Sequence, residues 1–146
     1  MNNKPRKIII AEDNLADVQL TKIAFEDIPL PLEVVHVFDG QELLDYVRKQ
    51  AVLSDIALIL LDLNMPRMGG VEVLKNFYND KELRKLPVVV LSSSRHETDV
   101  EACYEYGANA YVCKPIDIND FHVAIRSIAY FWGDINVLPS YDAQTV

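Results

Sequence analysis

The sequence predicts an α/β protein built around a parallel five-stranded sheet with helices on both faces. Short apolar runs alternate five times with helix-like patterns along the 146 residues, and strands joined through helices pair in parallel by right-handed crossovers. The run at 56–61 is apolar at six consecutive positions, as in a strand covered on both faces. Polar residues follow several of these runs, at the edge where open α/β sheets place their ligands.

The five strands are expected at regular intervals along the chain. They are residues 7–11, 32–38, 56–62, 86–91 and 110–113. The second run alternates apolar and polar residues, which favours the edge of a sheet over its centre. Pro87 lies at the entrance of the fourth run, where a missing backbone N–H is tolerated.

Helix-like spacing fills the intervals between the strands. Helices are expected up to about residue 27, after Asp39-Gly40, after Gly69-Gly70, at about 97–107 and at about 117–132. Gly107 is suited to follow the fourth helix, since glycine readily adopts the left-handed conformation found there. The residues placed on shared faces, in chain order, are Ala16, Leu20, Ile23 and Asp27; Leu43, Leu44 and Val47; Val71, Leu74 and Tyr78; and Phe121, Ile125, Ile128 and Trp132, the last set facing the sheet.

Composition restricts the possible partners and locations. The net charge of −8 and the pI near 4.8 disfavour direct binding of nucleic acid, because a polyanion needs a basic surface. No segment approaches the roughly 20 apolar residues of a membrane span, and the first residues lack a signal-peptide pattern. Cys103 and Cys113 have no CxxC spacing and are expected to be reduced rather than bridged. A cytoplasmic protein is therefore expected.

Carboxylates follow two strands that could be neighbours. Glu12-Asp13 comes after the first strand, and Asp62 ends the third. Carboxylates only a few ångströms apart either raise a pKa or recruit a cation, and an all-oxygen set without His or Cys suits magnesium, Mg²⁺. The alternative is that Glu12-Asp13 simply lies at the start of a helix, capped by Asp13 or Asn14.

Two further strand ends carry polar groups. The fourth strand ends at Ser92 and the fifth at Lys114. A lysine beside carboxylates is also compatible with a plain ion pair. Taken together, however, two acids, a hydroxyl and an ammonium would hold a divalent cation and a phosphoryl group attached to Asp62.

The order of these residues resembles the receiver domain of two-component response regulators. The resemblance covers about residues 5–132, and the matching residues are Glu12-Asp13, Asp62 with Asn64-Met65-Pro66, Gly69-Gly70, Ser92 and Lys114-Pro115. It implies the flavodoxin-like (βα)5 receiver fold with strand order 2-1-3-4-5, an order for which a receiver protein is itself one of the standard examples. The first and third strands would then be adjacent.

The resemblance also implies a role for each matching residue. Asp62 would accept a phosphoryl group from a sensor histidine kinase or a phosphotransfer protein. Mg²⁺ would be bound by the Asp13 and Asp62 side chains, the Asn64 carbonyl and, through water, Glu12. Lys114 would pair with the phosphoryl group, and the Lys114-Pro115 bond would be cis. Glu12 stands where many receivers have Asp, and Ser92 where Thr is commoner.

In such receivers phosphorylation changes a protein-interaction surface. Ser92 would move toward the new phosphate oxygens, draw the loop 92–94 with it, and free space for Tyr111 on the fifth strand. The output would be a changed surface on the fourth helix, fifth strand and fifth helix. The alternative for Tyr111 is an ordinary half-buried tyrosine.

The end of the chain is rich in aromatic residues. Eight of the thirteen aromatics lie at or after residue 104: Tyr104, Tyr106, Tyr111, Phe121, Tyr130, Phe131, Trp132 and Tyr141. Val123, Tyr130 and Phe131 fall off the stripe that faces the sheet, which favours a partner surface. The ending, interrupted at Gly133-Asp134, resembles that of small stand-alone regulators partnered with bacterial phytochromes. Residues 133–146 are expected to form an extension that joins the last helix in a homodimer.

Two other functions are alternatives to the phosphoacceptor. An aspartyl-phosphate phosphohydrolase also uses a strand-end Asp, Mg²⁺ and Lys, but it needs a second Asp two residues on, where this chain has Asn64. A phosphorylation-independent scaffold would not need the switch residues, all of which are present. His36, His96 and His122 lack metal-ligand or triad spacing and are expected to be ordinary. The chain is therefore expected to act on no outside substrate.

Overall fold

The computed structural model describes residues 5–138, which form a five-stranded parallel sheet between two layers of helices. The strands are β1 (Arg6–Ala11), β2 (Leu32–Val37), β3 (Ile56–Leu61), β4 (Val88–Ser92) and β5 (Ala110–Cys113). Their order is β2-β1-β3-β4-β5, with every pair parallel. The predicted fold and strand order are therefore confirmed, including the position of β2 at an edge.

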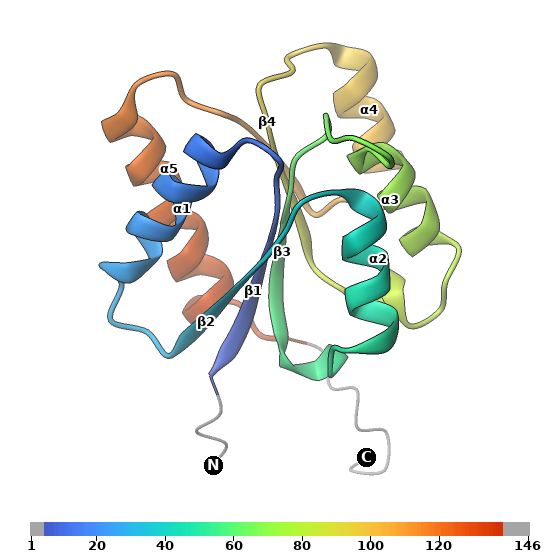
Figure 1. The fold of residues 1–146 in the computed structure, drawn as a ribbon, viewed down its shortest axis with the longest axis horizontal. Helices are drawn as coiled ribbons and strands as arrows, with labels where there is room; N and C mark the ends of the chain where they lie inside the picture. Colours follow the sequence, from blue (N-terminus) through green and yellow to red (C-terminus); the bar gives the residue numbers. More distant parts are fainter. Residues whose placement is uncertain (1–4, 139–146) are drawn as a thin grey trace.

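Helices cover both faces of this sheet. They are α1 (Leu15–Glu26), α2 (Gly40–Lys49), α3 (Gly70–Tyr78), α4 (Glu97–Glu105) and α5 (Ile118–Tyr130), followed by a π-helical turn, η3 (Phe131–Ile135). Two short 3₁₀ turns, η1 (Leu53–Asp55) and η2 (Leu83–Lys85), precede β3 and β4. Figure 1 shows α1 and α5 on one face and α2, α3 and α4 on the other. No helix within residues 5–138 combines the length and apolar character needed to cross a membrane.

The central strand explains why the sheet is covered twice. All six residues of β3 are buried, and alternate residues pack into different cores. Ile59 and Leu61 join the core beneath α2 and α3, whereas Leu58 and Leu60 join the core beneath α1 and α5. Because successive side chains of a strand point to opposite faces, an uninterrupted apolar run is what two cores require.

The residues predicted to share a face are buried on α2 and α5, whereas α1 and α3 bury partly different residues. Leu43, Leu44 and Val47 are buried on α2, as are Phe121, Ile125 and Ile128 on α5, while Trp132 is half-buried. On α1 the buried residues are Val18, Thr21, Ala24 and Phe25. Apolar residues surround α1, so spacing alone does not select a face, and Thr21 tolerates burial because its hydroxyl donates to the Asp17 carbonyl at 2.8 Å.

On α3 the difference is confined to Tyr78, since Leu74 is buried and Val71 packs against the core. Val73, Leu74 and Phe77 are buried, whereas Tyr78 is 51% exposed. Phe77 has no hydroxyl to satisfy and takes the inward position. Tyr78 keeps its hydroxyl near solvent and packs edge-on against Tyr106, with ring centroids 5.9 Å apart.

The predicted cis bond before Pro115 is also wrong, because residues 5–138 contain no cis peptide bond. The chain leaves β5 and enters α5 over residues 114–117, where Asp117 caps the helix by accepting from the Asp120 N–H at 3.0 Å. Trans peptides suffice for this turn, in keeping with their intrinsic advantage of about 0.5–1 kcal/mol before proline. Gly107 has φ +89° just after α4, as predicted for a glycine that follows a helix.

Candidate functional site

Three carboxylates meet at the carboxyl edge of β1 and β3. The adjacent strands bring them together, since the Asp62 N–H donates to the Ala11 carbonyl at 3.0 Å. One carboxylate oxygen from each of Glu12, Asp13 and Asp62 lies within 4.8 Å of the other two. Glu12 and Asp62 are only 5% and 7% exposed, whereas Asp13 is exposed. The cluster is therefore an oxygen-donor site with one side open to solvent, and its chemistry fits a hard divalent cation.

The helix that follows this cluster is capped by a different residue. Asn14 is the N-cap of α1, and its side-chain oxygen accepts from the Asp17 N–H at 3.1 Å. The Asn14 N–H in turn donates to Glu12 Oε2 at 3.2 Å. The capping alternative thus applies to Asn14 and not to Asp13.

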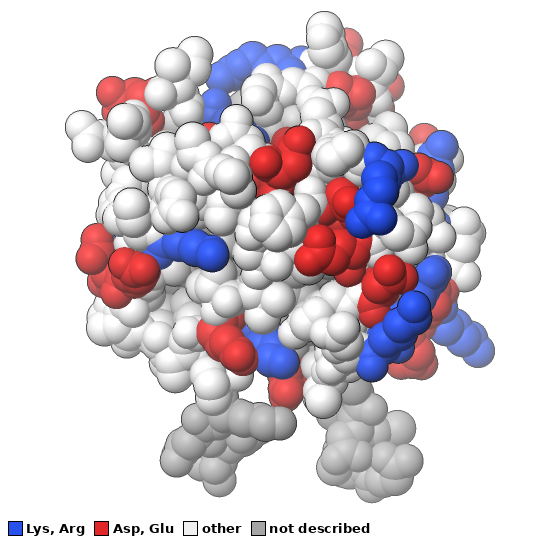
Figure 2. Space-filling view, viewed as in Figure 1, with Lys and Arg blue, Asp and Glu red and all other residues white. Residues whose placement is uncertain are grey.

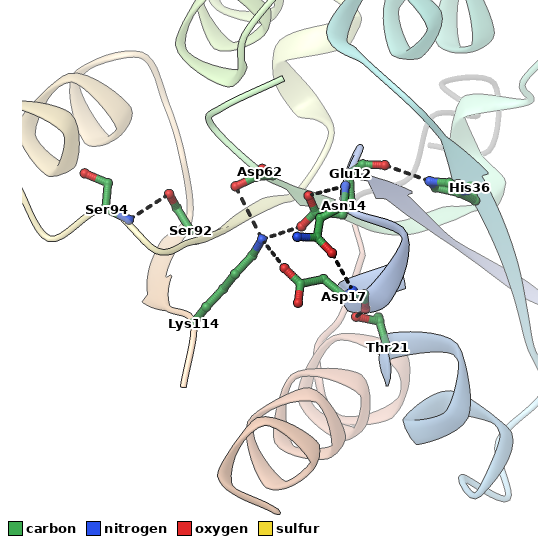
Figure 3. Close-up of polar contacts among 9 residues, drawn as sticks. All are labelled: Glu12, Asn14, Asp17, Thr21, His36, Asp62, Ser92, Ser94 and Lys114. Carbon is green, nitrogen blue, oxygen red and sulfur yellow. Dashed lines mark hydrogen bonds and ion pairs between the residues drawn. The ribbon is translucent and has the colours of Figure 1, made fainter. Parts of the chain in front are cut away.

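Lys114 reaches the cluster from the end of β5. Its Nζ lies 2.5 Å from Glu12 Oε1, 2.8 Å from Asp17 Oδ2 and 3.7 Å from Asp62 Oδ1, and its side chain is 9% exposed. Figure 3 shows the ammonium among these three carboxylates. In the absence of a cation or phosphate, the single ammonium of Lys114 is therefore shared by three carboxylates.

Burial and charge together shift the protonation of Asp62. Desolvation by burial, reinforced by the neighbouring Glu12 carboxylate, raises the pKa of Asp62 to about 7 although Lys114 acts in the opposite direction. Burial alone would lower the pKa of Lys114, but its hydrogen bonds to Asp17 and Glu12 raise that pKa above the ordinary lysine value. The lysine thus remains an ammonium, and Asp62 is the carboxylate of this cluster whose ionisation is disfavoured.

Ser92 and Tyr111 contact the same loop from different strands. Ser92 is fully buried at the end of β4, and its Oγ accepts from the Ser94 N–H at 3.2 Å. The Tyr111 hydroxyl donates to the Ser94 carbonyl at 2.8 Å. The strand that ends at Ser92 lies between β3 and β5, and the Lys114 N–H donates to the Ser92 carbonyl at 2.8 Å. Movement of either Ser92 or Tyr111 would therefore disturb the other through Ser94.

The loop after Asp62 is tied to the loop before α2. Arg67 is the one non-glycine residue of positive φ (63°) within residues 5–138, and its Nε lies 2.7 Å from Asp39 Oδ2. The Gly40 N–H donates to the Met68 carbonyl at 3.0 Å. A Cβ on Gly40 would lie 2.4 Å from that carbonyl oxygen, so the close approach requires glycine. Asn64 lies on this loop and is exposed.

Sequence reasoning missed several of these contacts. Asp17 was not singled out, although an acid three residues after the N-cap Asn14 stands at the same end of the sheet. His36 was expected to be ordinary, yet its Nε2 lies 2.8 Å from the backbone carbonyl of Glu12. The Asp39–Arg67 pair spans 28 residues, and no local pattern indicates it.

Comparison with known proteins decides the family. The sequence model of the response regulator receiver domain matches residues 8–126. The chain belongs to the receiver family. Response regulator Rcp1 of Synechocystis sp. is 32% identical over 142 residues, which cover 95% of this receiver and 97% of Rcp1.

Solved structures agree with the sequence match. The phosphorylated cyanobacterial phytochrome response regulator RcpA is 37% identical, with a TM-score of 0.86 over 93% of this receiver and 99% of that chain. The Mn²⁺-bound form of Rcp1 is 32% identical, with a TM-score of 0.85 over 93% of this receiver and 100% of that chain. The receiver takes part in two-component signalling as a phosphoryl acceptor. Receivers are phosphorylated by histidine kinases or phosphotransfer proteins, and they bind divalent cations in an acidic pocket such as the one described above.

Proposed function

We propose that Asp62 is the phosphoacceptor of this receiver. The observation that carries the proposal is its position: a buried carboxylate beside Glu12 and Asp13, with the Lys114 ammonium 3.7 Å from its Oδ1. A nucleophilic carboxylate must be ionised, and a neighbouring ammonium favours that form. The same ammonium would neutralise negative charge on a phosphoryl group bonded to Asp62.

The transfer exchanges one bond to phosphorus for another. A carboxylate oxygen of Asp62 attacks the phosphorus of a phosphohistidine, so that an O–P bond forms as the N–P bond breaks. The leaving imidazole nitrogen keeps the electron pair of the broken bond and takes up a proton. Hydrolysis later returns the free carboxylate and inorganic phosphate. The protein is both the acceptor and the site of this hydrolysis, and we infer no reaction on an outside substrate.

We infer that the cation of this pocket is Mg²⁺. The donors offered by Glu12, Asp13 and Asp62 are all oxygens, which suits Mg²⁺ better than the softer metals. Asp13, Asp62 and the Asn64 carbonyl would hold the ion, with Glu12 acting through water. When bound, the ion would neutralise charge on the phosphoryl oxygens. Removal by EDTA is expected to abolish phosphorylation.

We infer that Ser92 and Tyr111 convert phosphorylation into a change of surface. Both are linked through Ser94, by bonds of 3.2 Å and 2.8 Å. If the Ser92 hydroxyl turns toward a phosphoryl oxygen, it can no longer accept from the Ser94 N–H in the same way. The Tyr111 contact with Ser94 would then change, and with it the surface of α4, β5 and α5.

We propose a homodimer through α5 and the residues after it, with 5–132 as the receiver domain and 133–146 as an extension. Exposed apolar side chains support this surface: Val123 is 61%, Phe131 45%, Ile135 67% and Val137 88% exposed. Tyr130, which was expected to point away from the core, instead packs partly against it. Tyr141 lies outside the described residues. Light scattering at micromolar concentration that gave only a monomer mass, with and without phosphorylation, would contradict the dimer.

The charge distribution and the free cysteines argue against nucleic acid as a partner and against an oxidising compartment. Figure 2 shows Lys and Arg scattered among Asp and Glu on the visible face rather than gathered into a broad basic surface, which together with the net charge of −8 disfavours nucleic acid. Both cysteines are free thiols, as expected in a reducing compartment. We infer a cytoplasmic protein that acts by protein contact and not on a membrane.

A phosphodonor assay tests the role of Asp62 directly. Purified protein is incubated with acetyl phosphate and Mg²⁺, and phosphoprotein is separated by Phos-tag electrophoresis. Wild type should be labelled, and both Asp62→Asn and wild type with EDTA should lose at least about 99% of the signal, since the first lacks the nucleophilic carboxylate and the second lacks the cation. Asp45→Asn, which removes a carboxylate from α2, serves as the matched control. Equal labelling of wild type and Asp62→Asn would refute the assignment and favour the scaffold.

A further inference from the structure

Asp17 holds the ammonium group that a phosphoryl group on Asp62 would need. Its Oδ2 lies 2.8 Å from Lys114 Nζ, whereas Asp62 Oδ1 lies 3.7 Å from the same nitrogen. Asp17 extends from α1, and Figure 3 shows it approaching the lysine from a different element than Asp62 does. The ammonium is thus in hydrogen-bond contact with Asp17 and Glu12, but not with the acceptor carboxylate.

The backbone of Asp17 is fixed independently of its carboxylate. Its N–H donates to Asn14 Oδ1 at 3.1 Å, and its carbonyl accepts from the Thr21 hydroxyl at 2.8 Å. Within residues 5–138, Lys114 is the charged partner of the carboxylate itself, whose side chain is 25% exposed. Replacing the carboxylate by a carboxamide therefore removes the charge and leaves the start of α1 in place.

Two electrostatic effects of Asp17 oppose a phosphoryl group on Asp62. Its carboxylate attracts the Lys114 ammonium toward α1, and its negative charge repels the added phosphoryl charge. The first effect acts through the lysine and the second does not. Contacts between ions in a shielded site are stronger than exposed ones, and the first effect acts through a direct contact of 2.8 Å to a lysine that is 9% exposed.

We propose that Asp17 is a positioning residue that holds Lys114 in the unphosphorylated arrangement and so lowers the affinity of the site for a phosphoryl group. The proposal rests on the function inferred for Asp62 and adds a residue that sets how readily that function is exercised. Asp17 would keep the receiver in its resting state until a strong phosphodonor is met. Its removal should shift the equilibrium toward the phosphorylated arrangement.

Beryllofluoride provides an equilibrium test, because it binds a carboxylate reversibly in the shape of a phosphoryl group. Its affinity is measured by ¹⁹F NMR at saturating Mg²⁺ for wild type, Asp17→Asn and the control Glu26→Gln, which removes a charge from the far end of α1. Asp17→Asn should bind about fivefold to tenfold more tightly, as expected for release of one shielded ionic contact. Glu26→Gln should change the affinity by less than about twofold because of distance and screening. Unchanged affinity in Asp17→Asn would overturn the proposal.

A double-mutant cycle separates the two effects of Asp17. In a Lys114→Met background, Asp17→Asn should tighten binding by less than about twofold, since the lysine-mediated part is gone. A full fivefold effect without the lysine would show simple repulsion and overturn the positioning role. Absence of beryllofluoride binding by folded wild type would instead contradict the function assigned to Asp62.

A second measurement needs no lysine variant. In wild type, the Lys114 side-chain NMR signal should move when beryllofluoride binds. In Asp17→Asn the signal of the free protein should already lie nearer the bound position. Identical free-state signals in the two proteins would overturn the proposal even if Lys114→Met failed to fold.

Discussion

Asp62 and Asp39 are two carboxylates at the same edge of the sheet that have opposite electrostatic character. Both expose little surface, 7% and 5%, and each has a cationic neighbour. Burial raises the pKa of Asp62 to about 7, whereas the hydrogen bond from Arg67 lowers the pKa of Asp39 below its ordinary value. Low exposure by itself therefore does not predict the protonation of either group.

Burial of Asp62, together with the number of charges around each carboxylate, accounts for the difference between the two pKa shifts. Asp62 lies deep in the protein and shares one ammonium with Glu12 and Asp17. Asp39 lies just beneath the Arg67 side chain and also accepts from the Glu42 N–H at 2.8 Å. In the Asp39–Arg67 pair one negative charge is balanced by one positive charge, and the pair connects two loops. The Asp62 cluster is left with excess negative charge, which a bound cation would relieve.

The largest change in the free energy of unfolding should come from neutralising Asp62. Its folded-state pKa is raised, so the carboxyl stabilises the folded protein below its unfolded pKa near 4, and this stability is lost as pH rises to about 7. Asp62→Asn should therefore increase the free energy of unfolding at pH 8, by about 2 kcal/mol in the absence of divalent cations. The gain should shrink toward zero near pH 4. Urea denaturation in EDTA at both pH values measures it.

Destabilisation by Asp62→Asn at pH 8 would show that attraction to Lys114 outweighs burial and repulsion by Glu12. Millimolar Mg²⁺ provides an internal control. It should stabilise wild type more than Asp62→Asn, because only wild type retains the complete set of carboxylates.

Neutralising Asp39 is expected to lower the free energy of unfolding, by less than neutralising Asp62 raises it. Its folded-state pKa is lowered, so its stabilisation is present above the unfolded pKa near 4 and is lost as pH falls through the folded value. Asp39→Asn should cost about 1 kcal/mol at pH 7, since one charge-assisted hydrogen bond is weakened while Asn still caps α2. The cost should decrease at pH 3. A loss that persists at pH 3 would assign the effect to packing rather than to charge.

The smallest change in stability is expected from the backbone conformation of Arg67. Its side chain is 63% exposed and its φ is +63°, a conformation that favours glycine. Arg67→Gly should therefore unfold at a higher urea concentration than Arg67→Ala, although both lose the bond to Asp39. Equal midpoints would show that the loop relaxes to negative φ once the arginine is gone.

Local patterns were sufficient for the elements but not for every helix face. The uninterrupted run at 56–61 and the strand-end residues Asp62, Ser92 and Lys114 identified the sheet and its functional edge. On α1, however, apolar side chains occur on several sides, and contacts with α5 and the sheet decided that Val18 and Phe25 are buried while Ile23 is exposed. The trans peptide before Pro115 was likewise not evident from the residues around it.

The sequence by itself predicted the parallel α/β fold and the strand-end positions of Glu12, Asp13, Asp62 and Lys114, because apolar period and strand-end chemistry are local properties of the chain; their meeting followed from the resemblance to receivers. The tertiary structure decided which carboxylates share the lysine. Asp17 and Asp39 are ordinary acids in the sequence. They gained their partners because the start of α1 lies near Lys114, the residue after β5, and because two separate loops lie together. Electrostatic interaction depends on distance in space, and for residues 28 or 97 positions apart that distance is set only by the folded chain.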